Sequence, residues 1–200
     1  TIDDAGGTAT DSVVAGGYQN VVGGDNCAIL AGSTNDIDPG VTASAIVGGS
    51  ANGLTAGAGS AIIGGNNNLV GGSQGVIAGG TYNEIGGNST EAFIGGGSRN
   101  VADNIGVAIL ASLYSKSPDS ATSIYVALLA SRYCDVDLAT EENHMVCGGY
   151  DAGTTYVAPS WKIESNGGTF HSATGTIQAL DYAELFQNAD GKAHEPGQIL

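Results

Sequence analysis

Residues 44–49 read Ser44-Ala45-Ile46-Val47-Gly48-Gly49, and residues 60–65 repeat them as Ser60-Ala61-Ile62-Ile63-Gly64-Gly65. Each copy contains two bulky apolar residues followed by two small ones. Such blocks recur, with some drift, at 13–16, 29–32, 46–49, 62–65, 76–79, 93–96, 109–112, 128–131 and 145–148. Successive blocks start 14 to 19 residues apart. The chain is therefore an internal repeat with a period of about 16 residues.

A second apolar position falls eight residues after the start of most blocks. It is occupied by Val21, Ile37, Leu54, Val70 and Val101, with Ile85 one place later. An Asn usually comes just before it, as Asn20, Asn35, Asn52, Asn68, Asn83 and Asn100. We expect these Asn residues to adopt the left-handed conformation of tight turns, and the Gly pairs to form the other corners. Each period then carries two short strands.

Glycine makes up 34 of the 200 residues, which argues against helices. Gly costs about 0.8 to 1.0 kcal/mol relative to Ala inside a helix, so Gly-rich periods favour short strands and turns. A coil of about 16 residues is too small to enclose a core alone, but coils stacked about 4.8 Å apart share their backbone hydrogen bonds. The predicted fold is all-β, a parallel β-roll or β-solenoid of nine coils.

The charge balance limits the partners. The chain has 20 acidic residues against 5 basic ones, and no Lys or Arg precedes Arg99. A basic surface for nucleic-acid phosphates or anionic lipid is therefore excluded from the first half. The longest apolar run, residues 124–130, is too short to cross a membrane. The first residue is Thr1 rather than Met, so we expect a piece of a longer protein. No cofactor is expected.

The slender coils predict an oligomer. Val, Ile, Leu and Phe make up only about a fifth of the chain, near the lower limit for a packed core. We expect flat sides that expose little that is large or charged, with small residues that let backbones approach closely. Three copies packed around a threefold axis would supply the missing buried area, so a homotrimer is predicted.

The two blocks quoted first resemble the head repeats of trimeric autotransporter adhesins, which form left-handed parallel β-rolls. The likeness covers about residues 12–150, and phage tail fibres use similar rolls. The resemblance implies a trimeric rod that binds a surface.

The character of the sequence changes after Cys147, where aromatic residues accumulate. Residues 161–170 are expected to form a hairpin around the Asn166-Gly167 turn. We predict a β-roll shaft over 1–150, a small β-rich tip or cap over 151–180 and a further segment over 181–200. The aromatic rings of Tyr150, Tyr156 and Trp161 are candidates for stacking on sugars, although burial in a cap explains them equally well.

The last segment contains Asp181-Tyr182-Ala183-Glu184, followed by Phe186 and then Asp190-Gly191. It resembles the opening of the intramolecular-chaperone autoprotease domains of phage neck appendages and tail fibres. The resemblance implies self-cleavage on the amino side of Asp181, with Asp181 and Glu184 as the catalytic carboxylates. Three residues apart on a helical turn, the two could divide acid and base roles. The alternative is an ordinary helix N-cap, with Asp181 as the cap and Glu184 at the third helical position.

Other candidate sites are weaker. Cys27, Cys134 and Cys147 lack the spacing of a disulfide framework or a zinc site and are interpreted as small buried residues. His144, His171 and His194 are dispersed. The acidic stretch 135–142 could hold Ca²⁺ but lacks EF-hand spacing, which favours a solvated bulge and no metal site. Glu84 and Glu91, expected in turns of one coil, could form a glycosidase pair, but we expect no such enzyme.

The sequence leads to one principal functional hypothesis. The chain is expected to be the distal part of a homotrimeric phage tail fibre or appendage, located in the virion tail, with other virion tail proteins and a host cell-surface glycan or protein as partners. The alternative is the head of a bacterial trimeric autotransporter adhesin at the cell surface. A third hypothesis is a single-turnover self-cleaving precursor.

Overall fold

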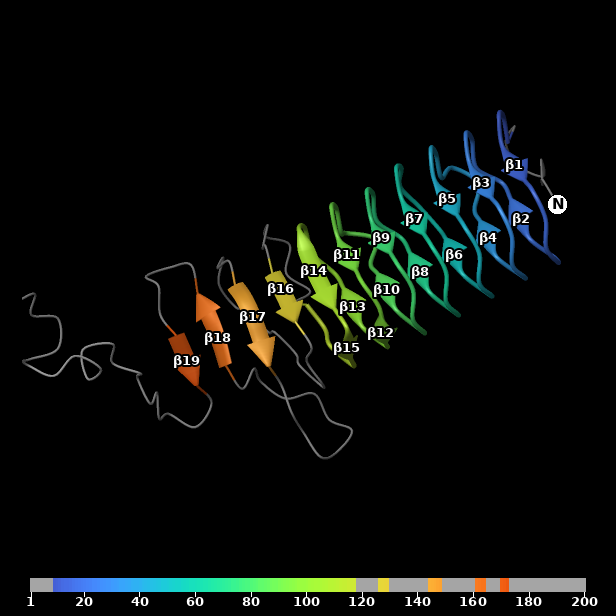
Figure 1. Ribbon diagram of the computed structural model, residues 1–200. Coiled ribbons are helices and arrows are strands. Elements are labelled where there is room, and N and C mark those ends of the chain that lie inside the picture. The colour runs from blue at the N-terminus through green and yellow to red at the C-terminus, as the bar shows by residue number, and fades with distance from the viewer. Residues whose placement is uncertain (1–8, 118–125, 130–143, 149–160, 165–169, 173–200) are drawn as a thin grey trace, which may run out of the picture.

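The computed structural model describes residues 9–117, 126–129, 144–148, 161–164 and 170–172. Every regular element within these residues is a β-strand. The chain winds as a β-solenoid of about seven turns, whose coils stack along one axis (Figure 1). This confirms the predicted all-β parallel solenoid.

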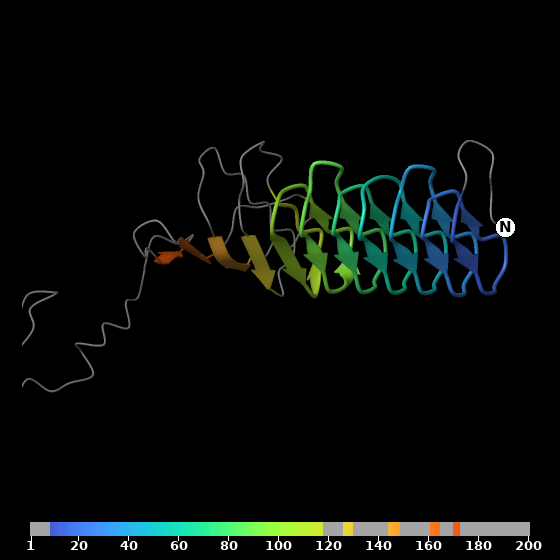
Figure 2. The same cartoon turned by 90° about the horizontal axis from the view of Figure 1, so that it is seen from above.

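Two sheets run along the rod and form two layers (Figure 2). Sheet 1 follows the order β1 (Val13–Val14), β3 (Ala28–Ile29), β5 (Ala45–Ile46), β7 (Ala61–Ile62), β9 (Val76–Ile77), β11 (Phe93–Ile94), β14 (Val107–Leu110), β16 (Val126–Leu129), β17 (His144–Gly148), β18 (Trp161–Glu164) and β19 (Phe170–Ser172). Sheet 2 follows the order β2 (Val21–Val22), β4 (Asp36–Ile37), β6 (Gly53–Leu54), β8 (Leu69–Val70), β10 (Glu84–Ile85) and β13 (Val101–Ala102). All pairs in sheet 2, and those in sheet 1 up to β17, are parallel.

A third and narrower side joins the two sheets within each coil. Single parallel bridges connect Tyr18, Ser33, Ser50, Asn66, Thr81 and Ser98 in turn, and β12 (Gly97–Ser98) pairs with β15 (Ser112–Leu113) at the end of this series. Further parallel bridges, from Asp25 through Thr42 to Ala58 and from Ser73 to Thr90, lie on the connection from sheet 2 back to sheet 1. Neighbouring coils are therefore bonded in both sheets and on both connections between them.

One core lies between the two sheets. Sheet 1 contributes the fully buried Ile29, Ile46, Ile62, Ile77, Ile94, Ile109 and Leu128, and sheet 2 contributes Val22, Ile37, Leu54, Val70, Ile85 and Ala102. These residues are register partners from coil to coil. Because neighbours in a strand face opposite ways, the residue next to each of them points outward.

The register shows which residue of each block is buried. Val14, Ile77 and Ile94 align with Ile29, whereas Val13, Val76 and Phe93, which start their blocks, lie on the outward side. In sheet 2, Val22 and Ala102 point inward, whereas Val21 and Val101, which follow the eight-residue spacing, point outward. Ile85 is in register with Val70. What recurs from coil to coil is one inward-pointing residue. It is the first of the two apolar residues in some blocks and the second, or the next residue, in others.

The predicted role of the Asn residues in left-handed turns was wrong. The positive φ belongs to the residue before each of them, at values from 52° to 56° in Gln19, Thr34, Ala51, Asn67, Tyr82 and Arg99. The Asn residues themselves are buried at 0 to 2% exposure. Their side chains are needed inside the coil, where they bond to the next coil.

These buried Asn residues form a ladder along the rod. The Oδ1 atom of Asn35 accepts the backbone N–H of Asn52 at 3.1 Å, and the Nδ2 of Asn52 donates to the carbonyls of Gly48 and Gly65 at 3.1 and 3.2 Å. Successive rungs of the ladder are 15, 17, 16, 15 and 17 residues apart. Coils of unequal length stay in register because the ladder bonds the same corner in each of them.

The Gly pairs that end the blocks do form a corner with positive φ, as predicted, whereas the pairs at 23–24, 71–72 and 86–87 have no positive φ. Gly49 has a φ of 89°, and a Cβ atom there would lie 2.2 Å from the carbonyl oxygen of Gly65 in the next coil. The second residue of the pair must therefore lack a side chain for the coils to approach.

The last predicted repeats are described in part. β16 and β17 extend sheet 1 in parallel, so the blocks at 128 and 145 each contribute a strand. β18 and β19 then pair antiparallel, with Trp161 opposite Ser172, which confirms the predicted hairpin pairing. The remaining parts of these two coils and the hairpin turn lie outside the described residues, and the role of this region as a tip stays a prediction.

Candidate functional site

The outer face of sheet 1 is apolar along the described rod. One outward row contains Val13, Ala28, Ala45, Ala61, Val76, Phe93 and Ala108, and the adjoining row contains Ala15, Leu30, Val47, Ile63, Ala78, Gly95 and Leu110. Ile63 is 52% exposed, Leu30 47% and Val47 40%. We call these two rows the apolar face. They correct the expectation that the flat sides expose little that is large.

The outer face of sheet 2 is polar and acidic. Its two outward rows contain Val21, Asp36, Gly53, Leu69, Glu84 and Val101, and Gly23, Asp38, Thr55, Gly71, Gly86 and Asp103. Four carboxylates thus lie on a side where the sequence predicted almost none. We call these two rows the polar face. Since the inward residues of both sheets meet in one core, the two faces point in opposite directions.

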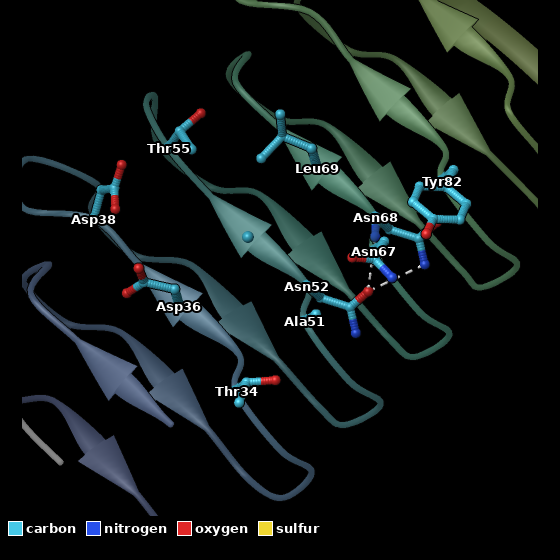
Figure 3. Close-up of a pocket in the computed structure, with 11 residues that line it drawn as sticks. Thr34, Asp36, Asp38, Ala51, Asn52, Thr55, Asn67, Asn68, Leu69 and Tyr82 are labelled. Atoms are coloured by element: carbon cyan, nitrogen blue, oxygen red, sulfur yellow. Dashed lines mark hydrogen bonds between the residues drawn. The ribbon is translucent and has the colours of Figure 1, made fainter. Parts of the chain in front are cut away.

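A hollow of about 420 Å³ lies on the polar face (Figure 3). It is lined by Thr34, Asp36, Asp38, Ala51, Asn52, Gly53, Thr55, Asn67, Asn68, Leu69 and Tyr82. Gly53 is the register partner of both Asp36 and Leu69 and has no side chain of its own. The hollow therefore exists because one position of the outward row, Gly53, carries no side chain.

An aromatic and cationic column stands beside the hollow. The Arg99 guanidinium lies 5.2 Å from the ring centroids of both Tyr82 and Tyr114. All three residues occupy the left-handed corner, in three successive coils. This stacking fixes the Tyr82 ring at one end of the hollow by cation–π attraction.

Most of the site residues expected from the sequence lie outside the described part of the chain. Tyr150, Tyr156, Asp181, Glu184, Cys134, His194 and the acidic stretch 135–142 are among them. Trp161 lies in β18, His144 and Cys147 in β17 and His171 in β19, where only the backbone is described. The tip site and the cleavage pair therefore stay predictions.

The suggested glycosidase pair does not share one turn. Glu84 lies in β10 on the polar face, so its predicted position in a turn was wrong, whereas Glu91 has a φ of 58° in the turn before β11. The reason is the alternation of the strand, in which Ile85 points inward and Glu84 outward. The two carboxylates thus lie on different elements.

Cys27 is buried at 1% exposure, which confirms its interpretation as a small core residue. Its Sγ lies 3.2 Å from the carbonyl oxygen of Asp25 and 3.6 Å from that of Val41. Burial, together with the nearby Asp25 carboxylate, raises the pKa of the Cys27 thiol. The thiol stays protonated and unreactive at neutral pH.

No protein-family model matches the chain, and no curated protein matches it either. In the described residues there is no helix of the length and hydropathy that a membrane span requires. The same residues contain no group of three or more His, Cys, Asp or Glu side chains placed to hold a metal ion.

Sequence reasoning missed both outer faces. The signal was present in the second apolar residue of the blocks, which is Leu30, Val47 or Ile63 in the first coils. Strand alternation turns this residue outward where the first apolar residue is buried, and the spacing along the chain does not reveal which of the two is buried.

Proposed function

We propose that this chain is the shaft of a homotrimeric fibre that attaches a phage virion to its host. The observation that supports it is the apolar face, two outward rows along the described rod that contain only apolar side chains and one glycine. Large exposed apolar patches mark association surfaces, because each Å² removed from water contributes about 25 cal/mol. A rod whose fully apolar side is flat and repetitive is suited to packing against copies of itself.

Threefold packing uses the difference between the faces. Three rods that turn their apolar faces to a common axis bury them together and leave the three polar faces in water. The resemblance of the repeats to trimeric adhesin heads and tail-fibre rolls favours three copies over two. The predicted tip, with Tyr150, Tyr156 and Trp161, would then present three sets of aromatic rings to the host surface.

The head of a bacterial trimeric adhesin is the second candidate, because it would use the same apolar face. The resemblance of residues 181–191 to a chaperone domain favours the fibre. The coding sequence beyond Leu200 separates the two proteins: a fibre should continue into a chaperone domain, and an adhesin into a coiled coil and a membrane anchor.

Self-cleavage at Asp181 belongs to the fibre proposal as a maturation step. In a precursor extended beyond Leu200, Asp181→Ala or Glu184→Ala should abolish the release of the carboxyl-terminal fragment on a denaturing gel. Unchanged fragments in both variants would exclude the two carboxylates from the cleavage.

Sedimentation equilibrium tests the assembly. The wild-type chain of 19.7 kDa should sediment at three times its own mass. Val47→Lys combined with Ile63→Lys places charges on the apolar face and should lower the mass to that of one chain.

Leu69→Lys is the matched control, because Leu69 is an exposed aliphatic residue of the polar face. This variant should keep the wild-type mass. A wild-type protein that sediments as a single chain, or variants of both faces that behave alike, would contradict the proposal.

A further inference from the structure

We propose that the hollow on the polar face binds a neutral polysaccharide along the side of the shaft, separately from the predicted tip. This inference rests on the proposed function, since it takes the polar face as the side of the fibre that is turned to the surroundings. The glycan site would then lie at a defined height on each of the three rods.

The shape of the hollow comes from one missing side chain. Asp36 and Leu69 flank Gly53 in the outward row, and a Cβ atom at Gly53 would lie 3.1 Å from Cδ1 of Leu69. The hollow extends over several coils rather than into the core (Figure 3). Coils repeat about every 4.8 Å, so a linear chain of sugars lying along the rod would meet similar positions in successive coils.

The lining has the groups that bind sugar hydroxyls. Thr55 carries a hydroxyl group, and Asp36 and Asp38 carry carboxylate oxygens that accept hydrogen bonds. Thr34 donates its hydroxyl proton to the Ser33 carbonyl and Asn67 donates to Asn66, so their oxygens add two acceptors. A sugar hydroxyl donates one hydrogen bond and accepts others, so mixed donors and acceptors suit it. Sites that bind small molecules typically combine such polar groups with an apolar surface, which Leu69 and Tyr82 supply here.

Tyr82 provides the stacking surface. Its side chain is 51% exposed and lines the hollow, and Arg99 covers it from the next coil. Ala51 and Asn67 also line the hollow, and they come from the two coils that precede Tyr82, whereas Arg99 comes from the coil that follows it. The ring face turned away from Arg99 is therefore directed toward the hollow. Aromatic rings in proteins stack against the C–H-rich faces of pyranose rings, and a ring already fixed by Arg99 loses little entropy on binding.

Charge selects a neutral glycan. Asp36 and Asp38 line the hollow, and the chain carries a net charge of −15. Within residues 9–117 only Arg99 and Lys116 are cationic, and Lys116 lies 4.0 Å from Asp103. Sialylated, phosphorylated or uronic-acid polymers would be repelled, so hexose polymers without acidic groups are the ligand class.

Calorimetric titration of the assembled wild-type protein with cellohexaose, mannohexaose and maltohexaose tests the site. At least one of these neutral probes should bind. Tyr82→Ala, which removes the stacking ring, and Gly53→Gln, which fills the hollow, should each weaken that binding at least tenfold.

Tyr18→Ala is the matched control, since Tyr18 is an exposed tyrosine, 67% accessible, that does not line the hollow. It should bind like the wild type. Circular dichroism and sedimentation establish that each variant is folded and assembled as the wild type is.

The outcomes separate this inference from the proposed function. If the protein sediments as a trimer and none of the three probes binds, the glycan site is wrong and the fibre stands. Binding that Tyr82→Ala and Gly53→Gln leave unchanged would place the glycan elsewhere and also overturn the inference. A monomeric mass would overturn the fibre, whatever the titration shows.

Discussion

The two sheets of the solenoid are alike on the inside and opposite on the outside. Ile46 in sheet 1 and Leu54 in sheet 2 are both fully buried in the same core. On the outer sides, Val47 and Ile63 lie on one surface of the rod, and Asp36 and Glu84 lie on the opposite surface. The shared core is built from the inward rows alone, so the outward difference between the sheets carries the information about what each side contacts.

The first consequence is that equivalent core substitutions should cost the same in both sheets. Ile46→Ala and Leu54→Ala should each lower the free energy of unfolding by about 2 to 5 kcal/mol, since both leave a cavity between the layers. Urea unfolding followed by circular dichroism, at one protein concentration, measures the loss. Thr55→Ala on the polar face is the control and should change it by less than about 0.5 kcal/mol. A small loss for Leu54→Ala alone would show that the two sheets do not share the core equally.

A smaller loss of unfolding free energy is expected at the Asn ladder, in the corner between the two sheets. Asn52→Ala leaves the backbone N–H of the buried Asn68 without the acceptor at 3.0 Å, and removes the donor to Gly48 and Gly65. It should cost about 1 to 3 kcal/mol in urea unfolding.

Asn67 is the control for Asn52, because it is an Asn of the same corner that does not belong to the ladder. It has a φ of 53°, and Ala51 occupies the same position one coil earlier, so the position accepts Ala. Asn67→Ala should cost clearly less than Asn52→Ala. Equal losses would mean that the ladder adds nothing beyond an ordinary polar turn.

The next effect concerns how closely the coils approach at the Gly pair. Gly49→Ala combines a φ of 89° with a Cβ atom 2.2 Å from the carbonyl oxygen of Gly65. The backbone conformation alone costs about 1 to 3 kcal/mol, and the contact adds to it, so the loss should be about 3 kcal/mol or more. Gly48→Ala has open space around it and should stay within about 0.5 kcal/mol. Thermal unfolding compares the two, and similar melting temperatures would contradict the assigned corner.

The smallest effect is a pH dependence at Cys27. Its pKa is raised in the folded state, so the native protein holds this proton more tightly than the unfolded chain does. The stabilisation is complete below the ordinary thiol pKa of about 8.5 and is lost as the pH rises through the folded pKa. Cys27 occupies the coil position of Ser12, Ser44 and Ser60, so Cys27→Ser should fold and lack this loss. The melting temperature should fall more between pH 7 and pH 10 in the wild type than in Cys27→Ser. An equal fall in the two proteins would contradict the raised pKa of Cys27.

The repeat, the β-solenoid and the Gly corners could be predicted because they depend on local spacing and on glycine conformation. The register could not be read correctly, since Val13-Val14 and Val76-Ile77 both offer two apolar residues and only pairing between coils decides which one is buried. The role of Asn52 was missed for a similar reason: its partners, Asn35 and Asn68, belong to other coils. The hollow depends on Gly53 lying between Asp36 and Leu69, a relation that exists only after the coils are stacked.

The central claim is that the apolar face is covered in the assembled protein and the polar face is not. Methyl NMR with a soluble paramagnetic probe measures this on Ile63 and Leu69, which are 52% and 37% exposed in the single chain. The trimeric fibre predicts strong protection of the Ile63 methyl groups and strong relaxation of those of Leu69. Relaxation of Ile63 at least as strong as that of Leu69 would contradict it.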